Sequence, residues 1–196
     1  MDMARARVSR NAWIDAALVA MARGGAAALA IDPLATGLGI SRGSFYWHFT
    51  DRDDLLRAVL ERWEQEGTEN VVAGLSAIDD PAERLLALFM AAVDDEEHLE
   101  GFEVALAAEA SHPIVGPVVA RVTERRLAAL AELFRELGFE AGAARQRAVM
   151  AYALYVGWIN LRHCSRDQVP EVGTAIRDGD RGTLAEAVRL LLTPLA

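Results

Sequence analysis

Apolar residues recur at three- and four-residue spacing along most of the chain, and no other feature constrains the fold as strongly. Near the N-terminus Ile14, Ala17, Leu18 and Met21 follow this spacing, which puts them on one face of a helix. The alternating polar and apolar pattern of half-buried strands is absent. The sequence therefore predicts an all-α fold of about nine helices.

Capping residues predict where several helices begin and end. Asp80 and Pro81, followed by Glu83, form a strong start signal, and Gly138 is a stop. Asp32 and Pro33 are interpreted as the start of a short helix to Leu38, and Ser41 as the cap of another that ends at Phe49. Further helices are expected at about 9–24, 51–66, 81–97, 101–110, 114–137, 145–163 and 183–195, with a domain boundary in the looser stretch 67–78. The helix at 145–163 is apolar on nearly every side, which predicts burial all round.

Composition excludes several classes of protein. A single cysteine among 196 residues rules out an internal disulfide framework and a cysteine-built zinc site. The longest uncharged apolar stretch, 148–161, is too short to span a bilayer, and no secretory signal is seen. We therefore expect a soluble cytoplasmic protein without a membrane partner, and no motif indicates a cofactor.

Residues 29–63 contain two short helices joined by a turn at Gly39, the pattern of a helix-turn-helix whose second helix enters the major groove of DNA. Phe45 and Phe49 are expected to hold the two helices together. The exposed face then carries the candidate DNA contacts, which are Ser41, Arg42, Gly43, Ser44, Tyr46, Trp47 and His48.

The chemistry of these side chains suits DNA. Ser41 stands beside free backbone N–H groups that a phosphate oxygen can occupy, and Arg42 can pair with phosphate or read guanine. The alternative is a short core helix with incidental aromatic residues. Tyr46, Trp47 and His48 follow one another, however, and a helix turns about 100° per residue, so they cannot all face one core.

The string GISRGSFYWHFTDRDDLLRAVLERW closely resembles the DNA-binding region of tetracycline-repressor (TetR) family transcription regulators, and the wider match runs from about Ser9 to Trp63. The resemblance implies a DNA-binding domain at 1–52 and a helical domain at 53–196 that binds a small-molecule effector and forms a homodimer. It also makes Arg52 a phosphate contact. Ala30 stands where the family often has Thr or Ser as a helix cap, so the sequence is interpreted as starting that helix late, at Asp32.

The resemblance implies an effector cavity among the middle helices of the second domain and a dimer interface of four helices, two from each subunit. Tyr155, Trp158 and Asn160 add hydrogen-bonding groups to an apolar helix, as a ligand site needs. The candidate ligand residues are Phe89, Val93, Phe102, Leu106, Tyr152, Tyr155, Trp158 and Asn160. The candidate dimer residues are Val156, Leu184, Val188, Leu191, Leu192 and Leu195.

Other interpretations of single residues are weaker. Glu109 and His112 have the spacing of one half of a di-iron site, but no second pair exists, so no metal is expected. Cys164 is interpreted as a small apolar filler rather than a redox sensor. Glu103 and Glu109 are interpreted as part of a solvated face rather than as partners of a cationic ligand. No catalytic constellation is found, which argues against an enzyme.

The net charge of −9 is unevenly distributed. Residues 1–48 hold five arginines and three aspartates, a net charge of +2, and the remainder carries −11. This charge distribution leaves DNA contact to one mildly basic end. Taken with the resemblance, it predicts a ligand-responsive repressor that binds a palindromic operator as a homodimer. The alternative from another class is a helical ligand-binding or interaction protein that does not bind DNA.

Overall fold

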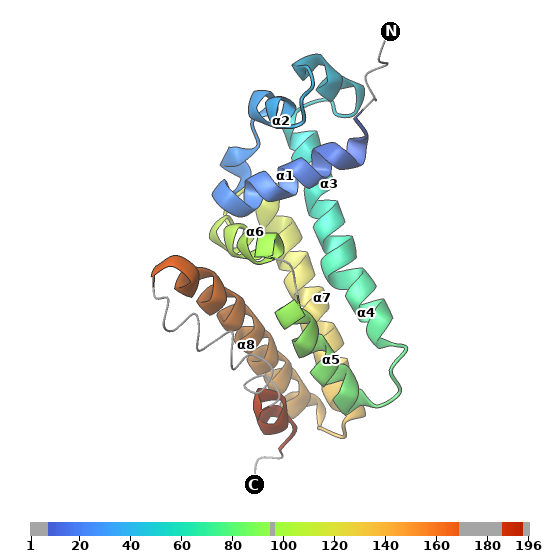
Figure 1. The fold of residues 1–196 in the computed structure, drawn as a ribbon. Coiled ribbons are helices and arrows are strands. Elements are labelled where there is room, and N and C mark those ends of the chain that lie inside the picture. The colour runs from blue at the N-terminus through green and yellow to red at the C-terminus, as the bar shows by residue number, and fades with distance from the viewer. Residues whose placement is uncertain (1–7, 95–96, 169–185, 194–196) are drawn as a thin grey trace.

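The computed structural model describes residues 8–94, 97–168 and 186–193, and this part of the chain contains helices and no strand (Figure 1). The all-α prediction is confirmed. None of the described helices combines the length and the apolar character that crossing a membrane requires.

The N-terminal unit consists of α1 (Arg10–Gly24), η1 (Ala26–Ala28), α2 (Ile31–Gly37), η2 (Arg42–Trp47) and α3 (Arg52–Glu64). Ser9 caps α1 by accepting the Ala12 N–H at 3.2 Å. Asp51 caps α3 by accepting the Asp54 N–H at 2.8 Å.

One predicted helix start is wrong, and one predicted helix differs in type. α2 begins at Ile31 with Ala30 as its cap, not at Asp32. Pro33 is tolerated at the third helical position because the first four N–H groups of a helix have no intrahelical partner. The segment predicted as a helix from Ser41 to Phe49 is a 3-10 helix, η2, in which Ser44 N–H donates to the Ser41 carbonyl at 3.0 Å.

The C-terminal part consists of η3 (Gln65–Glu69), α4 (Asn70–Leu75), α5 (Pro81–Asp94), α6 (Glu97–Ala108), α7 (Val115–Glu136) and α8 (Ala141–Gln168), with further helical residues at 186–192. The start at Pro81 is confirmed, because Asp80 accepts the Ala82 N–H at 2.8 Å. The helix expected at about 51–66 extends further than predicted, to Leu75. The helix of α3 continues through the π turn η3 into α4, so one rod leads from the N-terminal unit along the side of the molecule (Figure 1).

Two apolar clusters fill the interior. The first joins Trp13, Phe45 and Leu56 of the N-terminal unit to Phe102 of α6 and Val122 of α7. The second lies between α5, α7 and α8 and includes Leu85, Phe134 and Trp158. The first cluster runs without interruption from the N-terminal unit into α6 and α7, so the N-terminal unit is seated on those helices.

The crossing of α1 and α6 is close enough to require a glycine. A Cβ atom added at Gly101 would lie 2.9 Å from the carbonyl oxygen of Ala22, which is below normal van der Waals contact. Helix backbones that approach this closely leave no room for a side chain.

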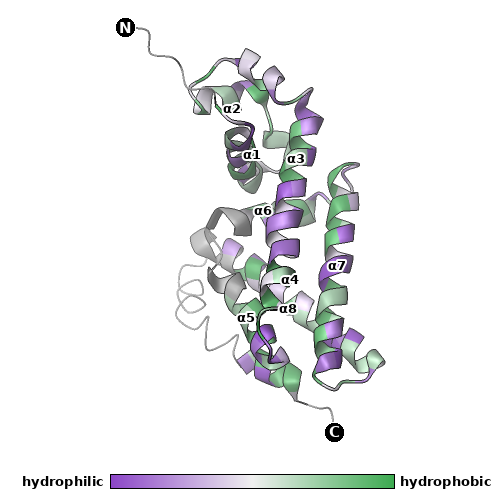
Figure 2. Cartoon of the chain, turned by 90° about the vertical axis from the view of Figure 1, so that its right-hand side faces the viewer, coloured by the Kyte–Doolittle hydropathy of each residue, from purple (hydrophilic) through white to green (hydrophobic). Residues whose placement is uncertain are grey.

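The predicted burial of α8 on all sides is wrong for the single chain. Val149, Met150 and Leu161 are 56%, 59% and 52% exposed. Figure 2 colours the described helices by hydropathy, with apolar residues in green.

The α1–α6 crossing gives a testable expectation. Gly101→Ala should lower the free energy of unfolding by about 1–3 kcal/mol, since two helix backbones must separate. Gly74→Ala is the matched control, because Gly74 is helical and has no atom within 4 Å of its added Cβ. It should raise stability by up to about 1 kcal/mol. Urea unfolding of both variants measures the difference, and equal effects would contradict the crossing.

Candidate functional site

η2 is held to the N-terminal unit by aromatic packing. Phe45 is fully buried and meets Trp13 edge-to-face, with 5.3 Å between ring centroids. Phe49 lies 5.4 Å from Phe45 and under the guanidinium of Arg10 at 4.9 Å. These contacts fix the position of η2 while its other face stays in solvent.

The solvent face of η2 carries large aromatic side chains. Trp47 is 78% exposed and Tyr46 is 53% exposed, and Ser41 and Gly43 are also at the surface. Ser44 is partly buried. Exposed aromatic groups of this size beside a cation form a contact surface rather than a core.

Arg42 is oriented by its neighbours on that surface. Its guanidinium donates to the hydroxyl of Tyr46 at 3.3 Å and to the carboxylate of Asp32 at 3.4 Å. The Tyr46 hydrogen bond and then the negative charge of Asp32 raise the pKa of Arg42. The arginine is therefore a permanently charged group held on the outer face of the helix pair.

His48 and Arg52, two further predicted phosphate contacts, bond to the protein itself. The Nε2 atom of His48 lies 2.9 Å from the Val8 carbonyl oxygen. Arg52 donates from Nε to the Leu29 carbonyl at 3.0 Å and from Nη2 to the Ala26 carbonyl. Arg52 thus clamps the turn between α1 and α2, and a DNA contact for either residue stays a prediction.

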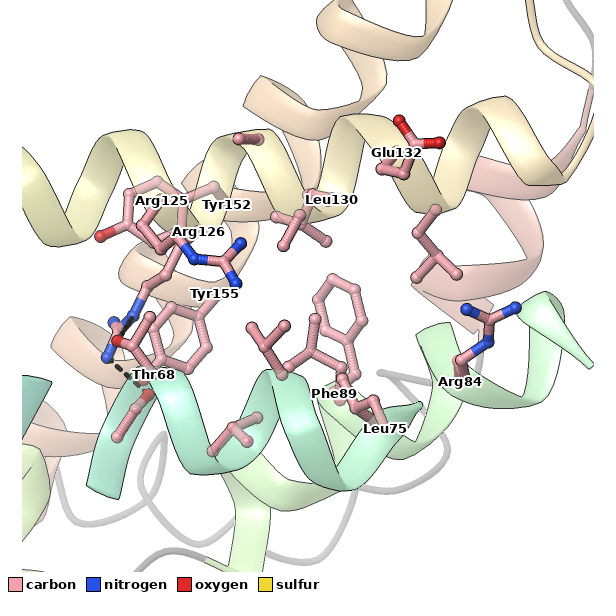
Figure 3. A pocket seen from close by; sticks show the side chains of 18 of the residues that line it. Thr68, Leu75, Arg84, Phe89, Arg125, Arg126, Leu130, Glu132, Tyr152 and Tyr155 are labelled. Atoms are coloured by element: carbon pink, nitrogen blue, oxygen red, sulfur yellow. Dashed lines mark hydrogen bonds between the residues drawn. The ribbon is translucent and has the colours of Figure 1, made fainter. Parts of the chain in front are cut away.

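A cavity of about 850 Å³ lies between the α3–α4 rod, α5, α7 and α8. Figure 3 shows Thr68, Arg126, Tyr152 and Tyr155 together at one end, Leu75, Phe89 and Leu130 further along, and Arg84 with Glu132 at the other end. The volume is within the range of sites that hold drug-sized molecules.

The predicted ligand residues divide between this cavity and other places. Phe89, Tyr152 and Tyr155 line the cavity. Phe102 and Leu106 belong to the first apolar cluster and Trp158 to the second. Asn160 donates to the Val156 carbonyl of its own helix at 2.8 Å, and the side chain of Val93 lies outside the described residues.

The carboxylate of Glu103 is the polar centre of the cavity wall. It accepts hydrogen bonds from the Trp63 indole at 3.0 Å, the Tyr155 hydroxyl at 3.0 Å and the Arg126 guanidinium at 2.8 Å and 3.3 Å. These donors come from α3, α8 and α7, while Glu103 itself lies on α6. Four helices therefore meet at one largely buried charge.

Arg126 connects the same centre to the π turn. Its Nε donates to the Thr68 hydroxyl at 2.9 Å and its Nη2 to the Gly67 carbonyl at 3.0 Å. Burial opposes the charge of Arg126, but the Glu103 carboxylate and the nearby tyrosines outweigh burial and raise the pKa of Arg126. Its guanidinium also lies 5.3 Å from the Trp63 ring and 5.7 Å from the Tyr155 ring, which adds cation–π attraction.

Sequence reasoning missed Glu103, Arg126 and Thr68, and the interpretation of Glu103 and Glu109 as a solvated face is wrong. Glu109 accepts the Ala26 N–H at 2.6 Å, and His112 accepts the Ile114 N–H at 3.2 Å. The sequence did contain a signal for Arg126. Val122, Arg126 and Leu130 follow one another at four-residue spacing, and an apolar residue is expected at the middle position.

In the described part of the chain, no group of three His, Cys, Asp or Glu residues is arranged to hold a metal.

The outer face of α8 carries a straight row of exposed residues. Val149, Ala153, Gly157 and Leu161 follow one another at four-residue spacing and are all exposed. Of the predicted dimer residues, Val188 and Leu191 are buried against the second cluster, and Val156 and Leu192 are partly buried. Leu184 and Leu195 lie outside the described residues, and the role of all six in dimerisation stays a prediction.

Comparison with known proteins gives matches at two levels. Residues 14–59 match the model of the bacterial regulatory proteins of the tetR family. Over 57 residues the chain is 39% identical to the uncharacterized HTH-type transcriptional regulator TtgW of Pseudomonas putida. That match covers 29% of this chain and 42% of the relative, so it spans less than half of either protein.

Solved structures match over nearly the whole length. A putative transcriptional regulator from Saccharomonospora viridis in complex with choline has a TM-score of 0.73 at 21% identity, covering 92% of this chain and 95% of that one. A putative TetR-family regulator from Rhodococcus sp. has a TM-score of 0.69 at 21% identity, over 94% and 98%. A TetR regulator from Legionella pneumophila has a TM-score of 0.72 at 17% identity, over 95% and 99%. These likenesses show the fold.

The clamp of Arg52 predicts a specific loss of stability. Arg52→Met should lower the free energy of unfolding by about 1–3 kcal/mol, because the partly buried Leu29 carbonyl loses its side-chain donor and the Ala26 carbonyl keeps only the Leu29 N–H. Arg57→Met on the same helix is the control, since Arg57 is exposed. It should change stability by no more than about 0.5 kcal/mol. Denaturant unfolding without DNA measures both, and a neutral Arg52→Met would contradict the clamp.

Proposed function

Since the chain belongs to the TetR family of transcriptional regulators, we propose that it is a ligand-responsive repressor. In this proposal it binds a palindromic DNA operator as a homodimer and releases it when a small-molecule effector occupies the cavity beside α4. The exposed aromatic and basic face of η2 is the observation that carries the proposal.

The chemistry of η2 supports DNA binding. Trp47 and Tyr46 project from an element that buried phenylalanines hold in place, and Arg42 beside them is charged at every physiological pH. A guanidinium can pair with phosphate or read guanine, and a tyrosine hydroxyl can donate to phosphate. The group is small, so affinity must come from two copies acting together rather than from a broad basic surface.

The cavity supports the response to a ligand. It is lined mostly by apolar side chains, with polar and charged groups at both ends, and an apolar wall with a few polar groups is the usual make-up of a small-molecule site. The related fold from Saccharomonospora viridis was solved in complex with choline, and this supports the idea that the architecture accommodates small molecules.

The exposed row on α8 supports a homodimer. Residues at four-residue spacing form a ridge along a helix, and such ridges pack between helices. Ala153 and Gly157 at its middle let a second helix approach closely, and Val149, Met150 and Leu161 supply apolar area. A two-fold axis beside α8 gives two copies of η2, which then meet half-sites about one turn of DNA, roughly 34–36 Å, or a multiple apart.

DNA selection with the purified protein and random oligonucleotides tests the main proposal. It should enrich a palindrome, and binding to that sequence should weaken steeply as salt increases. Failure to enrich any palindrome would favour a helical ligand-binding protein that does not act on DNA.

Single substitutions then test whether the exposed face of η2 is the DNA-binding surface. Arg42→Ala and Trp47→Ala should each reduce affinity for the selected operator by about tenfold or more, equal to about 1–3 kcal/mol for a good contact. Arg135→Ala removes an exposed arginine from the end of α7 and should leave affinity unchanged. Fluorescence anisotropy with labelled operator measures all three, and equal affinities would remove η2 from the interface.

The dimer is tested with a matched pair of charge substitutions. Val149→Glu places a carboxylate in the exposed row of α8 and should shift the protein to a monomer at micromolar concentration, because an interface cannot bury an unpaired charge. Val19→Glu makes the same change on α1, where Val19 is 38% exposed, and should leave the dimer intact. Light scattering that finds a dimer in both cases would exclude the α8 row.

A further inference from the structure

The charges around the cavity are already paired with one another. Four arginines and four glutamates line it, which balances their charge. Arg126 pairs with Glu103 at 2.8 Å, Arg84 with Glu136, and Arg62 with Glu66 at 3.5 Å. Arg125 pairs with Glu69, just outside the lining, at 3.2 Å. The Arg126–Glu103 pair is the largely buried one, so a charged ligand at that end would have to break it or leave a charge uncompensated, and both are costly.

The buried pair at the polar end leaves no capacity for a cation. The Glu103 carboxylate already accepts four hydrogen bonds, and two carboxylate oxygens offer about four acceptor sites. Two aromatic rings at this end of the wall, Trp63 and Tyr155, already face the guanidinium of Arg126. At these two rings the protein's own arginine occupies the position that a cationic headgroup would need.

Arg126 retains one donor. A guanidinium has five N–H groups, and four hydrogen bonds from Arg126 go to Thr68, Gly67 and the two oxygens of Glu103. Within the described residues, the second N–H of Nη1 has no acceptor. The group that fits here is an uncharged acceptor, such as a carbonyl or ether oxygen.

The lining of the middle of the cavity determines the polarity that the rest of the ligand must have. This part is lined by Val71, Val72 and Leu75 of α4, Leu88 and Phe89 of α5, and Leu130 of α7. Burying apolar surface here is favourable by about 25 cal/mol per Å², whereas a polar group without a partner is penalised.

We propose that the cavity selects an uncharged, predominantly apolar ligand carrying a hydrogen-bond acceptor, and that the Glu103–Arg126 pair enforces this selection against ions. This inference rests on the proposed function in one respect, which is that the selected ligand is taken to be the effector. The selectivity of the cavity for uncharged ligands does not depend on DNA binding.

A matched series of probes tests the selection. Prodan, an uncharged naphthyl ketone, is titrated by its fluorescence. Its trimethylammonium derivative and the corresponding naphthoate are then tested as competitors. Prodan should bind at least about tenfold more tightly than either ion. Ala129→Trp, which fills the cavity from α7, should abolish the Prodan signal and so locate it. A wild-type protein that binds no probe, or binds the cation as tightly as Prodan, overturns the proposal.

Removing either member of the Glu103–Arg126 pair should strengthen binding of one ionic probe, and the two variants should favour ions of opposite charge. Glu103→Gln leaves Arg126 without its counter-charge and should strengthen binding of the naphthoate by about tenfold. Arg126→Met leaves Glu103 unpaired and should strengthen binding of the trimethylammonium probe by a similar factor. Glu132→Gln is the control, because it makes the same change in charge on an exposed lining residue and should leave the order of affinities unchanged.

Two further measurements separate the possible failures. Circular dichroism identifies a variant that does not fold, and Glu103→Gln, which nearly preserves shape, carries the test if Arg126→Met is unfolded. An unchanged order of affinities in folded Glu103→Gln overturns the role of the pair. Operator binding is measured separately without probes, so a protein that selects Prodan but enriches no palindrome would refute the proposed function and leave the selectivity intact.

Discussion

The carboxylate of Glu103 ties together helices that no continuous stretch of sequence brings together. Its donors are Trp63 on α3, Arg126 on α7 and Tyr155 on α8, and a buried charge of this kind is tolerated only when its partners are in place. The position of each helix is therefore set by the others. Because α3 also belongs to the N-terminal unit, the wall of the cavity and the base of that unit are parts of one hydrogen-bonded structure.

α6 extends this connection toward η2. It carries Glu103 at the cavity, Gly101 at the close crossing with α1, and, just beyond its end, Glu109 on the Ala26 N–H. Arg52 of α3 bonds to the carbonyl of that same residue. A ligand acts on an equilibrium only through its different affinities for two states, and here a state that displaces Glu103 also strains the turn that leads into α2.

Local signals in the sequence predicted local structure well. The start signal at Asp80 and Pro81 acts within a few residues of itself. The consecutive aromatic residues of η2 cannot all be buried against one core, so some of them had to be exposed. The π turn at η3 left no such signal, because a hydrogen bond one residue longer than that of an α-helix has no distinctive composition. The Glu103–Arg126 pair joins residues on different helices, and only the position of Arg126 within an apolar row hinted that its charge was buried and paired.

α8 brings the cavity and the proposed dimer interface onto one rigid element. Its inner side presents Ala151, Tyr152 and Tyr155 to the cavity, while Val149 and Leu161 of its outer row face solvent in the single chain. A helix packed along its length against α7 moves as a body, since close-packed side chains have few alternative arrangements. A shift of Tyr155 with Glu103 is therefore also a shift of the surface that meets a second copy. In a dimer of this geometry the separation of the two η2 elements depends on the same helix that lines the cavity.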